Sequence, residues 1–292
     1  TFERFPDKYK CWWGVDTLPE VNKDNEDYRR FILAEDGVAR RWMRAGTAGW
    51  RLDVADELPM RFLRDLRTAV RTQDAQAALL GEVWEDASNK VSYGAQRCYC
   101  LGDTLDSVMN YPLREGLIGF LLGEIDAYAL KRRLDALYEN YPAPFAAALM
   151  NLLGSHDKAR VINRLSGAEP ENRPREERAF TPLTDVEYER GKRRFIKAWC
   201  FLCAMPGMPC LYYGDEAGAQ GGDDPFCRGT YPWGHEDHAL IEEIKRVNHA
   251  RLESRAAQNG SLELIASDTD TLTAVRRYEE DELRVTLDRR DD

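Results

Sequence analysis

The stretch AGWRLDVADELP, residues 48–59, decides the predicted fold because its charged and apolar residues alternate. In a β-strand this alternation places Arg51 and Asp53 on one face and the apolar side chains on the other. Two charges inside a fold are costly unless they are paired or used, and the acids and proline that follow predict a helix start. A charged pair where a strand feeds a helix is typical of the catalytic end of a parallel α/β protein.

Composition and charge limit the classes of partner. The 292 residues are 43% hydrophobic and 10% aromatic, which predicts a globular protein with one large and one small domain. The net charge is −10, and glutamates balance the arginines of segment 168–180. These features disfavour nucleic acids and anionic membranes as partners and favour a neutral ligand. The sequence has no apolar run of the roughly 18 residues that a membrane span needs.

The seven cysteines predict buried free thiols in a reducing compartment. Cys200 and Cys203 form a CxxC pair, but the pair lies in an apolar helical stretch. A zinc site would need a second pair or nearby histidines, and the chain has four histidines in all. The opening residues carry no signal-peptide pattern, so we expect a cytoplasmic protein.

Apolar strand-like runs alternate with amphipathic helical patterns, which predicts a parallel sheet with right-handed crossovers. Five runs are expected as strands: 48–55, 77–84, 106–112, 147–157 and 208–216. Helices are expected around them, among others at 28–46, 60–72, 186–205 and 239–252. After Asn259, short alternating runs separated by turn residues predict an antiparallel module of about three strands, with a boundary near Gln258.

Four expected strands end in residues that could carry chemistry: Arg51, Asp53, Glu82, Trp84, His156, Asp157, Asp215 and Glu216. Each has another explanation, such as a helix N-cap for Asp53, a core ion pair for Glu82 and a satisfied core histidine for His156. Together, acids at the same ends of successive parallel strands would converge on one mouth and repel one another unless a function uses them.

Glycoside hydrolysis fits three convergent carboxylates, because one serves as nucleophile, one as proton donor, and further groups stabilise an oxocarbenium-like state. The sequence has no glycine-rich phosphate loop and no GxSxG motif, which leaves phosphoryl transfer and serine hydrolysis unsupported. A metal-dependent barrel enzyme with acidic ligands is the alternative from these features alone.

Four motifs, GWRLDVADE, GEVWEDA, NLLGSHD and GMPCLYYGDE, resemble in content and order the signature strands of the α-amylase family of glycoside hydrolases. TLPEVN, residues 17–22, is similar to the marker at the end of that family's B domain. DSVMNYP and GGDDPFCR make the resemblance closest to neopullulanases, cyclomaltodextrinases and maltodextrin glucosidases. The resemblance covers nearly the whole chain.

The resemblance implies Asp53 as the nucleophile, Glu82 as the general acid/base and Asp157 as the residue that holds sugar hydroxyls and distorts the ring. It implies that Arg51 keeps Asp53 ionised and oriented, which agrees with the effect of an arginine beside a carboxylate. His156 would stabilise the transition state through the same hydroxyls.

The resemblance also implies that Glu57 and Trp84 lie near the acceptor sugar. It requires no organic cofactor, allows calcium without assigning metal ligands, and allows a homodimer of the full-length protein. Two positions depart from the relatives: Lys158 replaces a small polar residue, and Asp56 replaces an asparagine that neopullulanases usually carry.

The implied fold is a TIM (β/α)8 barrel of the α-amylase type, with about five βα units present, followed by the start of an antiparallel β-sandwich domain. Residues 1–22 would end the B domain, 23–257 would form the C-terminal portion of the catalytic barrel, and 258–292 would be a partial C-terminal β domain. Because the signature strand upstream of the B domain is absent, we expect a fragment that lacks the N-terminal part of the barrel.

The implied function is a retaining α-glucan hydrolase that uses double displacement. Its substrates would be maltodextrins, cyclodextrins or pullulan, cleaved at α-1,4 bonds, with α-1,6 bonds as a further option. A transglycosylase on α-glucans would share every catalytic residue, and a non-catalytic amylase-like scaffold that binds glycans is the alternative outside the enzymes. The presence of all three carboxylates favours an enzyme.

Overall fold

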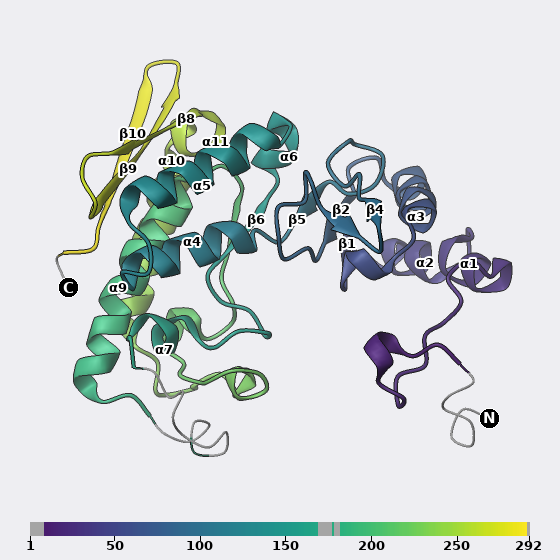
Figure 1. The fold of residues 1–292 in the computed structure, drawn as a ribbon, viewed down its shortest axis with the longest axis horizontal. Coiled ribbons are helices and arrows are strands. Elements are labelled where there is room, and N and C mark those ends of the chain that lie inside the picture. Colours follow the sequence, from purple (N-terminus) through teal and green to yellow (C-terminus); the bar gives the residue numbers. More distant parts are fainter. Residues whose placement is uncertain (1–8, 169–176, 178–181, 291–292) are drawn as a thin grey trace.

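The structure is a computed structural model that describes residues 9–168, 177 and 182–290. These residues form two lobes that meet where β5 and β6 lie side by side (Figure 1). The charge-balanced segment 168–180 lies almost wholly outside the described residues, as do residues 1–8.

Five short parallel strands run through the two lobes in chain order: β1 (Gly49–Leu52), β2 (Ala78–Gly81), β5 (Ser107–Val108), β6 (Met150–Leu152) and β7 (Met208–Cys210). β1, β2 and β5 pair in that order, β6 pairs with β7, and a parallel bridge between Met109 and Met150 connects the two sets. Within the described residues these pairings leave the sheet open. The five expected parallel strands are confirmed. Each is shorter than expected, because only two to four residues of each expected run pair with a neighbouring strand.

Helices surround these strands, and the longer ones are α1 (Glu26–Leu33), α2 (Val38–Arg44), α3 (Met60–Gln73), α4 (Tyr111–Leu121), α5 (Ala127–Asn140), α9 (Asp185–Ala204) and α10 (His238–Glu253). Shorter elements fill the connections: α6 (Ala143–Ala147), α7 (Val161–Leu165), α11 (Arg255–Asn259), and the hairpin of β3 (Val91–Ser92) and β4 (Ala95–Gln96). Single 3₁₀ turns occur at η2 (Trp12–Gly14), η3 (Ala55–Glu57), η4 (Asp215–Ala217) and η5 (Phe226–Arg228).

Two expected elements are wrong in extent. The helix expected over 28–46 is two helices, α1 and α2, separated by a turn in which the N–H of Gly37 donates to the Ala34 carbonyl. A Cβ atom at Gly37 would lie 2.9 Å from the backbone of Ala34 and Ile32. The strand expected over 106–112 is the two-residue β5, after which the Asn110 side chain caps α4 by accepting from the backbone N–H of Leu113.

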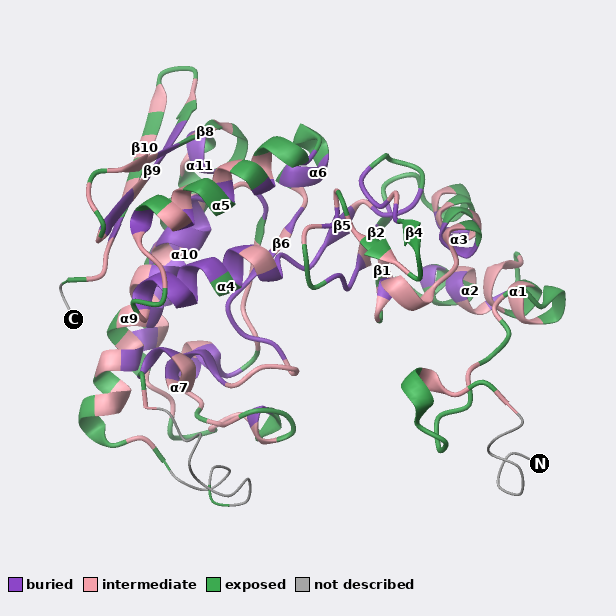
Figure 2. Ribbon diagram, in the orientation of Figure 1, coloured by how far each residue is buried: buried purple, intermediate pink, exposed green. Residues whose placement is uncertain are grey.

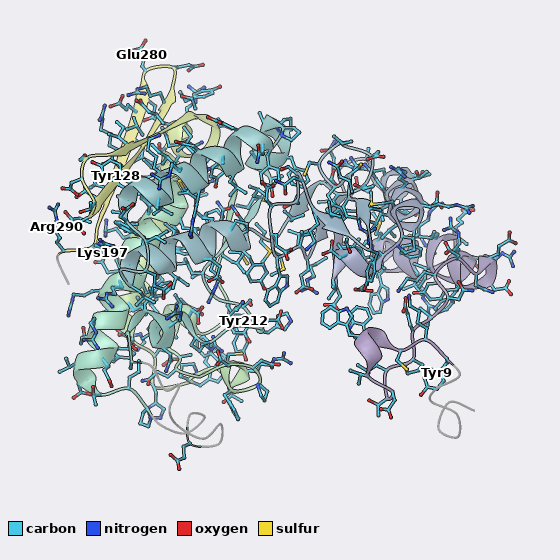
Figure 3. All side chains as sticks on the ribbon, in the orientation of Figure 1. Tyr9, Tyr128, Lys197, Tyr212, Glu280 and Arg290 are labelled. Carbon is cyan, nitrogen blue, oxygen red and sulfur yellow. The ribbon has the colours of Figure 1, made fainter. Side chains whose placement is uncertain are left out.

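The C-terminal residues form an antiparallel sheet, as expected, from β8 (Ser261–Ala266), β9 (Thr271–Tyr278) and β10 (Asp281–Asp288) in the order β10-β9-β8. Its buried leucines share one core with the buried aromatic residues of α9, so sheet and helices stabilise each other. Lys197 of α9 donates to the carbonyl of Asp288, while Glu280 lies at the tip of the hairpin, away from the helices (Figure 3).

Burial differs between the elements (Figure 2). α4 is buried along most of its length, whereas α1 has no buried residue. Within the described part of the chain no disulfide joins two cysteines, and Cys100, Cys203 and Cys227 are buried while the other four are half-buried. None of the helices that the structure describes is both long and apolar enough to cross a membrane.

Gly49 offers a test of the β1–β2 packing. A Cβ atom at this position would overlap the carbonyl oxygen of Ala78, whereas one at Gly229 would meet no atom within 4 Å. We expect Gly49→Ala to lower the free energy of unfolding by about 1–3 kcal/mol, because the strand must move away from its neighbour. Urea unfolding followed by circular dichroism measures this, with Gly229→Ala as the control. Equal stabilities of the two variants would contradict close packing of β1 on β2 at Gly49.

Candidate active site

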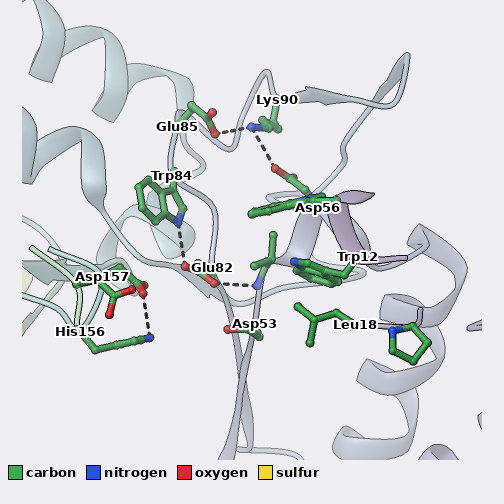
Figure 4. Close-up of a pocket in the computed structure, with 14 residues that line it drawn as sticks. Trp12, Leu18, Asp53, Asp56, Glu82, Trp84, Glu85, Lys90, His156 and Asp157 are labelled. Atoms are coloured by element: carbon green, nitrogen blue, oxygen red, sulfur yellow. Dashed lines mark hydrogen bonds and ion pairs between the residues drawn. The ribbon is translucent and has the colours of Figure 1, made fainter. Parts of the chain in front are cut away.

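A cavity of about 1030 Å³ lies beyond the ends of β1, β2 and β6 (Figure 4). It is lined by Trp12, Trp13, Leu18, Pro19, Asp53, Val54, Asp56, Glu82, Trp84, Glu85, Lys90, His156, Asp157 and Asp224. Trp12 and Leu18 lie across the cavity from His156 and Asp157 (Figure 4). The cavity therefore brings together five of the seven residues to which the family resemblance assigns a role, namely Asp53, Glu82, Trp84, His156 and Asp157.

Arg51 links the two carboxylates that follow β1 and β2. Its Nη1 lies 2.5 Å from Asp53 Oδ1, and its Nη2 lies 3.0 Å from Glu82 Oε2. The Glu82 side chain is 4% exposed and the Asp53 side chain 72% exposed. A buried carboxylate needs such a partner, and the same cation reduces the repulsion between the two acids. Asp53 lies one residue beyond the end of β1, so this contact rather than strand alternation places the two charges together.

Glu82 also holds the backbone of the turn after β1. Val54 has φ 35° and ψ 72°, a left-handed conformation that is strained for a β-branched residue. Its N–H donates to Glu82 Oε2 at 2.8 Å, and the N–H of Ala55 donates to the Glu82 carbonyl at 3.0 Å. These two hydrogen bonds satisfy the turn and leave the Asp53 side chain at the cavity.

The two oxygens of Glu82 differ in their partners. Oε2 receives the N–H of Val54 and the Arg51 guanidinium, whereas Oε1 receives the indole N–H of Trp84 at 2.9 Å. A carboxylate oxygen has about two acceptor positions, so Oε2 is fully used and Oε1 retains one. Oε1 is therefore the oxygen that can carry a proton without losing a hydrogen bond.

His156 and Asp157 form the opposite wall of the cavity. His156 Nε2 lies 3.4 Å from Asp157 Oδ1, and Arg228 Nη2 lies 3.7 Å from the same oxygen. The His156 side chain is 45% exposed, which argues against a satisfied core histidine. Its carbonyl accepts from Arg228 Nε at 3.0 Å and from Cys227 Sγ at 3.1 Å, so the loop that carries it is held from two sides.

Glu57 does not line the cavity. Its carboxylate accepts from Trp13 Nε1 at 2.9 Å and from the hydroxyl of Tyr93, so it ties the N-terminal segment to the β3–β4 hairpin. We call Trp13 and Tyr93 the aromatic wall. The expected place of Glu57 near an acceptor sugar stays a prediction, because in the structure its carboxylate is bonded to this wall.

Several cavity residues were not found from the sequence, among them Trp12, Lys90 and Asp224. Lys90 Nζ lies 3.1 Å from Asp56 Oδ2 and also contacts Glu85, which neutralises part of the acidic lining. The adjacent tryptophans of CWWG were a usable signal, since aromatic side chains are common in ligand sites. The contacts of Lys90 with Asp56 and Glu85 had no comparable signal in the sequence, because folding brings these side chains together.

The acids after β7 lie outside the cavity lining. Asp215 is buried and its Oδ1 lies 3.1 Å from Arg160 Nη1. Asp53 does not act as a helix cap either, since Val54 and Pro59 occupy the N-cap positions of η3 and α3 without side-chain cap bonds. Glu216 carries a buried oxygen, Oε2, that has no hydrogen-bond partner in the structure.

The described residues contain no group of three or more His, Cys, Asp or Glu side chains arranged to hold a metal ion. Cys200 and Cys203 lie on α9, and neither lines the cavity. Calcium dependence and the absence of an organic cofactor stay predictions.

Comparison with known proteins places the cavity in context. The protein-family model for the alpha amylase catalytic domain matches residues 1–270 of this chain. An amylopullulanase from Thermoanaerobacterium thermosulfurigenes is 33% identical over 295 residues, which cover 92% of this chain and 15% of that protein. A cyclomaltodextrinase from Geobacillus thermopakistaniensis is 32% identical over 266 residues, which cover 90% of this chain and 39% of that protein.

A similar solved structure is the ligand-free cyclic alpha-maltosyl-(1→6)-maltose hydrolase from Arthrobacter globiformis, with a TM-score of 0.81 and 31% identity. The match covers 96% of this chain and 56% of that chain. The chain thus spans about half of this structure and less than half of the two relatives named above.

Asp215 gives the fold a testable pH dependence. Burial raises the pKa of Asp215 from 3.8 to about 7, against the opposing effect of Arg160. The folded chain therefore binds this proton more tightly than the unfolded chain, and its stability falls as pH rises from about 4 to about 7. Relative to Asp215→Asn, the wild type should lose free energy of unfolding across that window in urea titrations. Asp36→Asn, at an exposed position between α1 and α2, is the control for the loss of one carboxylate. Parallel curves for wild type and Asp215→Asn would refute the assignment.

Proposed function

Because the chain belongs to the α-amylase family of glycoside hydrolases, we propose that its cavity is the catalytic centre of a retaining α-glucan hydrolase. The proposed substrates are maltodextrins, cyclodextrins or pullulan, cleaved at α-1,4 and, as a further option, α-1,6 glucosidic bonds. Transglycosylation onto a second sugar is the alternative outcome of the same chemistry.

The observation that carries the proposal is the bridge that Arg51 makes between Asp53 and Glu82. Both carboxylates lie against one guanidinium, and retaining glycosidases hold their two carboxyl groups only about 5–5.5 Å apart. An inverting enzyme needs a wider gap for a water molecule, which one bridging arginine disfavours.

In the proposed reaction, Asp53 attacks the anomeric carbon while the glycosidic bond breaks, and Glu82 gives its proton to the leaving oxygen. Glu82 then takes a proton from water as that water attacks the glycosyl–Asp53 ester, which restores both carboxyl groups. Oε1 of Glu82 suits the transfer because it retains an acceptor position beside the Trp84 hydrogen bond. Two displacements retain the α configuration.

His156 and Asp157 are proposed to bind the hydroxyls of the reacting sugar, since they line the wall opposite Trp12. Trp12 and Trp84 offer aromatic surfaces on which sugar rings can pack. Glu57 is proposed to act near the acceptor sugar through the aromatic wall to which it is bonded.

We propose that the five parallel strands are part of an eight-stranded barrel, with a C-terminal β-sandwich begun by β8, β9 and β10. The support is the family match and the similarity to the Arthrobacter structure. Since the chain spans only part of those relatives, the activity is proposed for the whole protein, in the cytoplasm and as a homodimer.

The test is hydrolysis of maltotriose and pullulan by the 292-residue chain and by a form extended at its N-terminus. We expect Asp53→Asn and Glu82→Gln each to lower kcat on the order of 10⁴-fold in whichever form is active, because each removes one step of the double displacement. Asp135→Asn, an acid of α5 outside the cavity, is the matched control.

Product analysis separates the alternatives. Longer oligosaccharides formed from maltotriose would indicate transglycosylation. Binding of α-glucan without turnover, in a folded protein with both carboxylates intact, would overturn the hydrolase proposal and favour a glycan-binding scaffold.

A further inference from the structure

Lys158, the residue after Asp157, lies against the aromatic pair beside the cavity. Its Nζ is 4.2 Å from the ring centroid of Trp84 and 5.7 Å from that of Tyr111. The two rings are stacked, with centroids 4.8 Å apart and an interplanar angle of 23°. An ammonium within about 6 Å of an aromatic face is attracted by the ring, most strongly by tryptophan.

Competing partners for this ammonium are weak. Among the described residues the nearest carboxylate is Glu115, whose Oε1 is 3.9 Å away on a side chain that is 52% exposed. Burial lowers the pKa of Lys158 and Arg114 lowers it further, while the charges of Glu115, Asp157 and Asp223 raise it. A partly dehydrated ammonium gains more from an aromatic face than a solvated one, so the rings are its main partner.

The backbone around Lys158 is held in the same place. The N–H of Lys158 donates to the Ser155 carbonyl at 3.3 Å, and the Ser155 hydroxyl lies 3.2 Å from the Tyr111 hydroxyl. The Ser155 hydroxyl oxygen also accepts from the N–H of Asp157 at 3.2 Å. The loop after β6 is thereby bonded to α4, which brings the lysine to the rings in one geometry.

We propose that Lys158 is a positioning residue for Glu82, which acts through Trp84. The ammonium holds the indole so that its N–H stays on Glu82 Oε1, the oxygen with an acceptor position left for the proton. This inference rests on the proposed role of Glu82 as general acid/base. It assigns to the loop after β6 a second task, since this loop also carries His156 and Asp157.

The test follows the indole N–H of Trp84 by ¹H–¹⁵N NMR, which needs no turnover. The chain has seven tryptophans, and the Trp84 signal is identified by its loss in Trp84→Phe. Glu82→Ala supplies the values for an indole without this hydrogen bond. We expect Lys158→Met to move the Trp84 signal towards those values and to speed its exchange with water on the order of tenfold. Lys158→Arg, which keeps a cation, should restore both.

Controls and activity separate the two proposals. Lys131→Met, on α5, should leave the Trp84 signal unchanged, and the other six indole signals report whether Lys158→Met is folded. If Lys158→Met does not fold, Lys158→Gln is the neutral variant to measure instead. If the whole protein is active, kcat should fall in Lys158→Met more than KM changes and recover in Lys158→Arg. If the Trp84 signal is identical in the wild type and in a folded neutral variant, Lys158 does not position the indole. If the Trp84 signal changes as expected but the whole protein is inactive, the positioning role stands and the hydrolase proposal fails.

Discussion

The bridge from Arg51 to Asp53 and Glu82 is the interaction on which the cavity depends. A carboxylate as buried as that of Glu82 is costly without a charged partner, and two acids after neighbouring strands would repel each other. Since Glu82 also binds the strained backbone at Val54, one side chain couples the charge of the site to the shape of the turn. The β1–β2 pairing and the cavity are therefore parts of one arrangement.

The remaining walls come from segments that are distant along the chain. The loop after β6 brings a histidine and an aspartate, and the segment before α1 brings the tryptophans that Glu57 helps to hold. The C-terminal sheet packs on α9 and stabilises that helix. Arg276 of β9 is buried and donates from Nη1 to the Ala204 carbonyl at the end of α9, and burial lowers its pKa to about 10. Such a donor satisfies a helix end that would otherwise lie buried without a partner.

Sequence patterns predicted the elements well where one local period persisted, and less well where packing changed it. Residues 28–46 show one helical pattern, yet close backbone contact at Gly37 divides them. Asp215 and Glu216 stand at the end of an expected strand just as Glu82 does, but the structure places them in η4, where Asp215 meets Arg160 inside the fold. The first exception is a local turn, in which the N–H of Gly37 donates to the Ala34 carbonyl, and the second depends on Arg160, which folding brings next to Asp215. Side-chain periodicity contains neither.

By itself the sequence determined the five parallel strands and their places along the chain, the antiparallel C-terminal sheet and the membership in a family whose motifs include Asp53, Glu82 and Asp157. Alternation and motif spacing are local properties, so they can be read along the chain. Only the tertiary structure decided that Arg51 bridges two acids, that Trp12 faces the histidine wall and that Lys158 lies on Trp84. These contacts join different elements, and their energies depend on burial and distance, which exist only once the chain has folded.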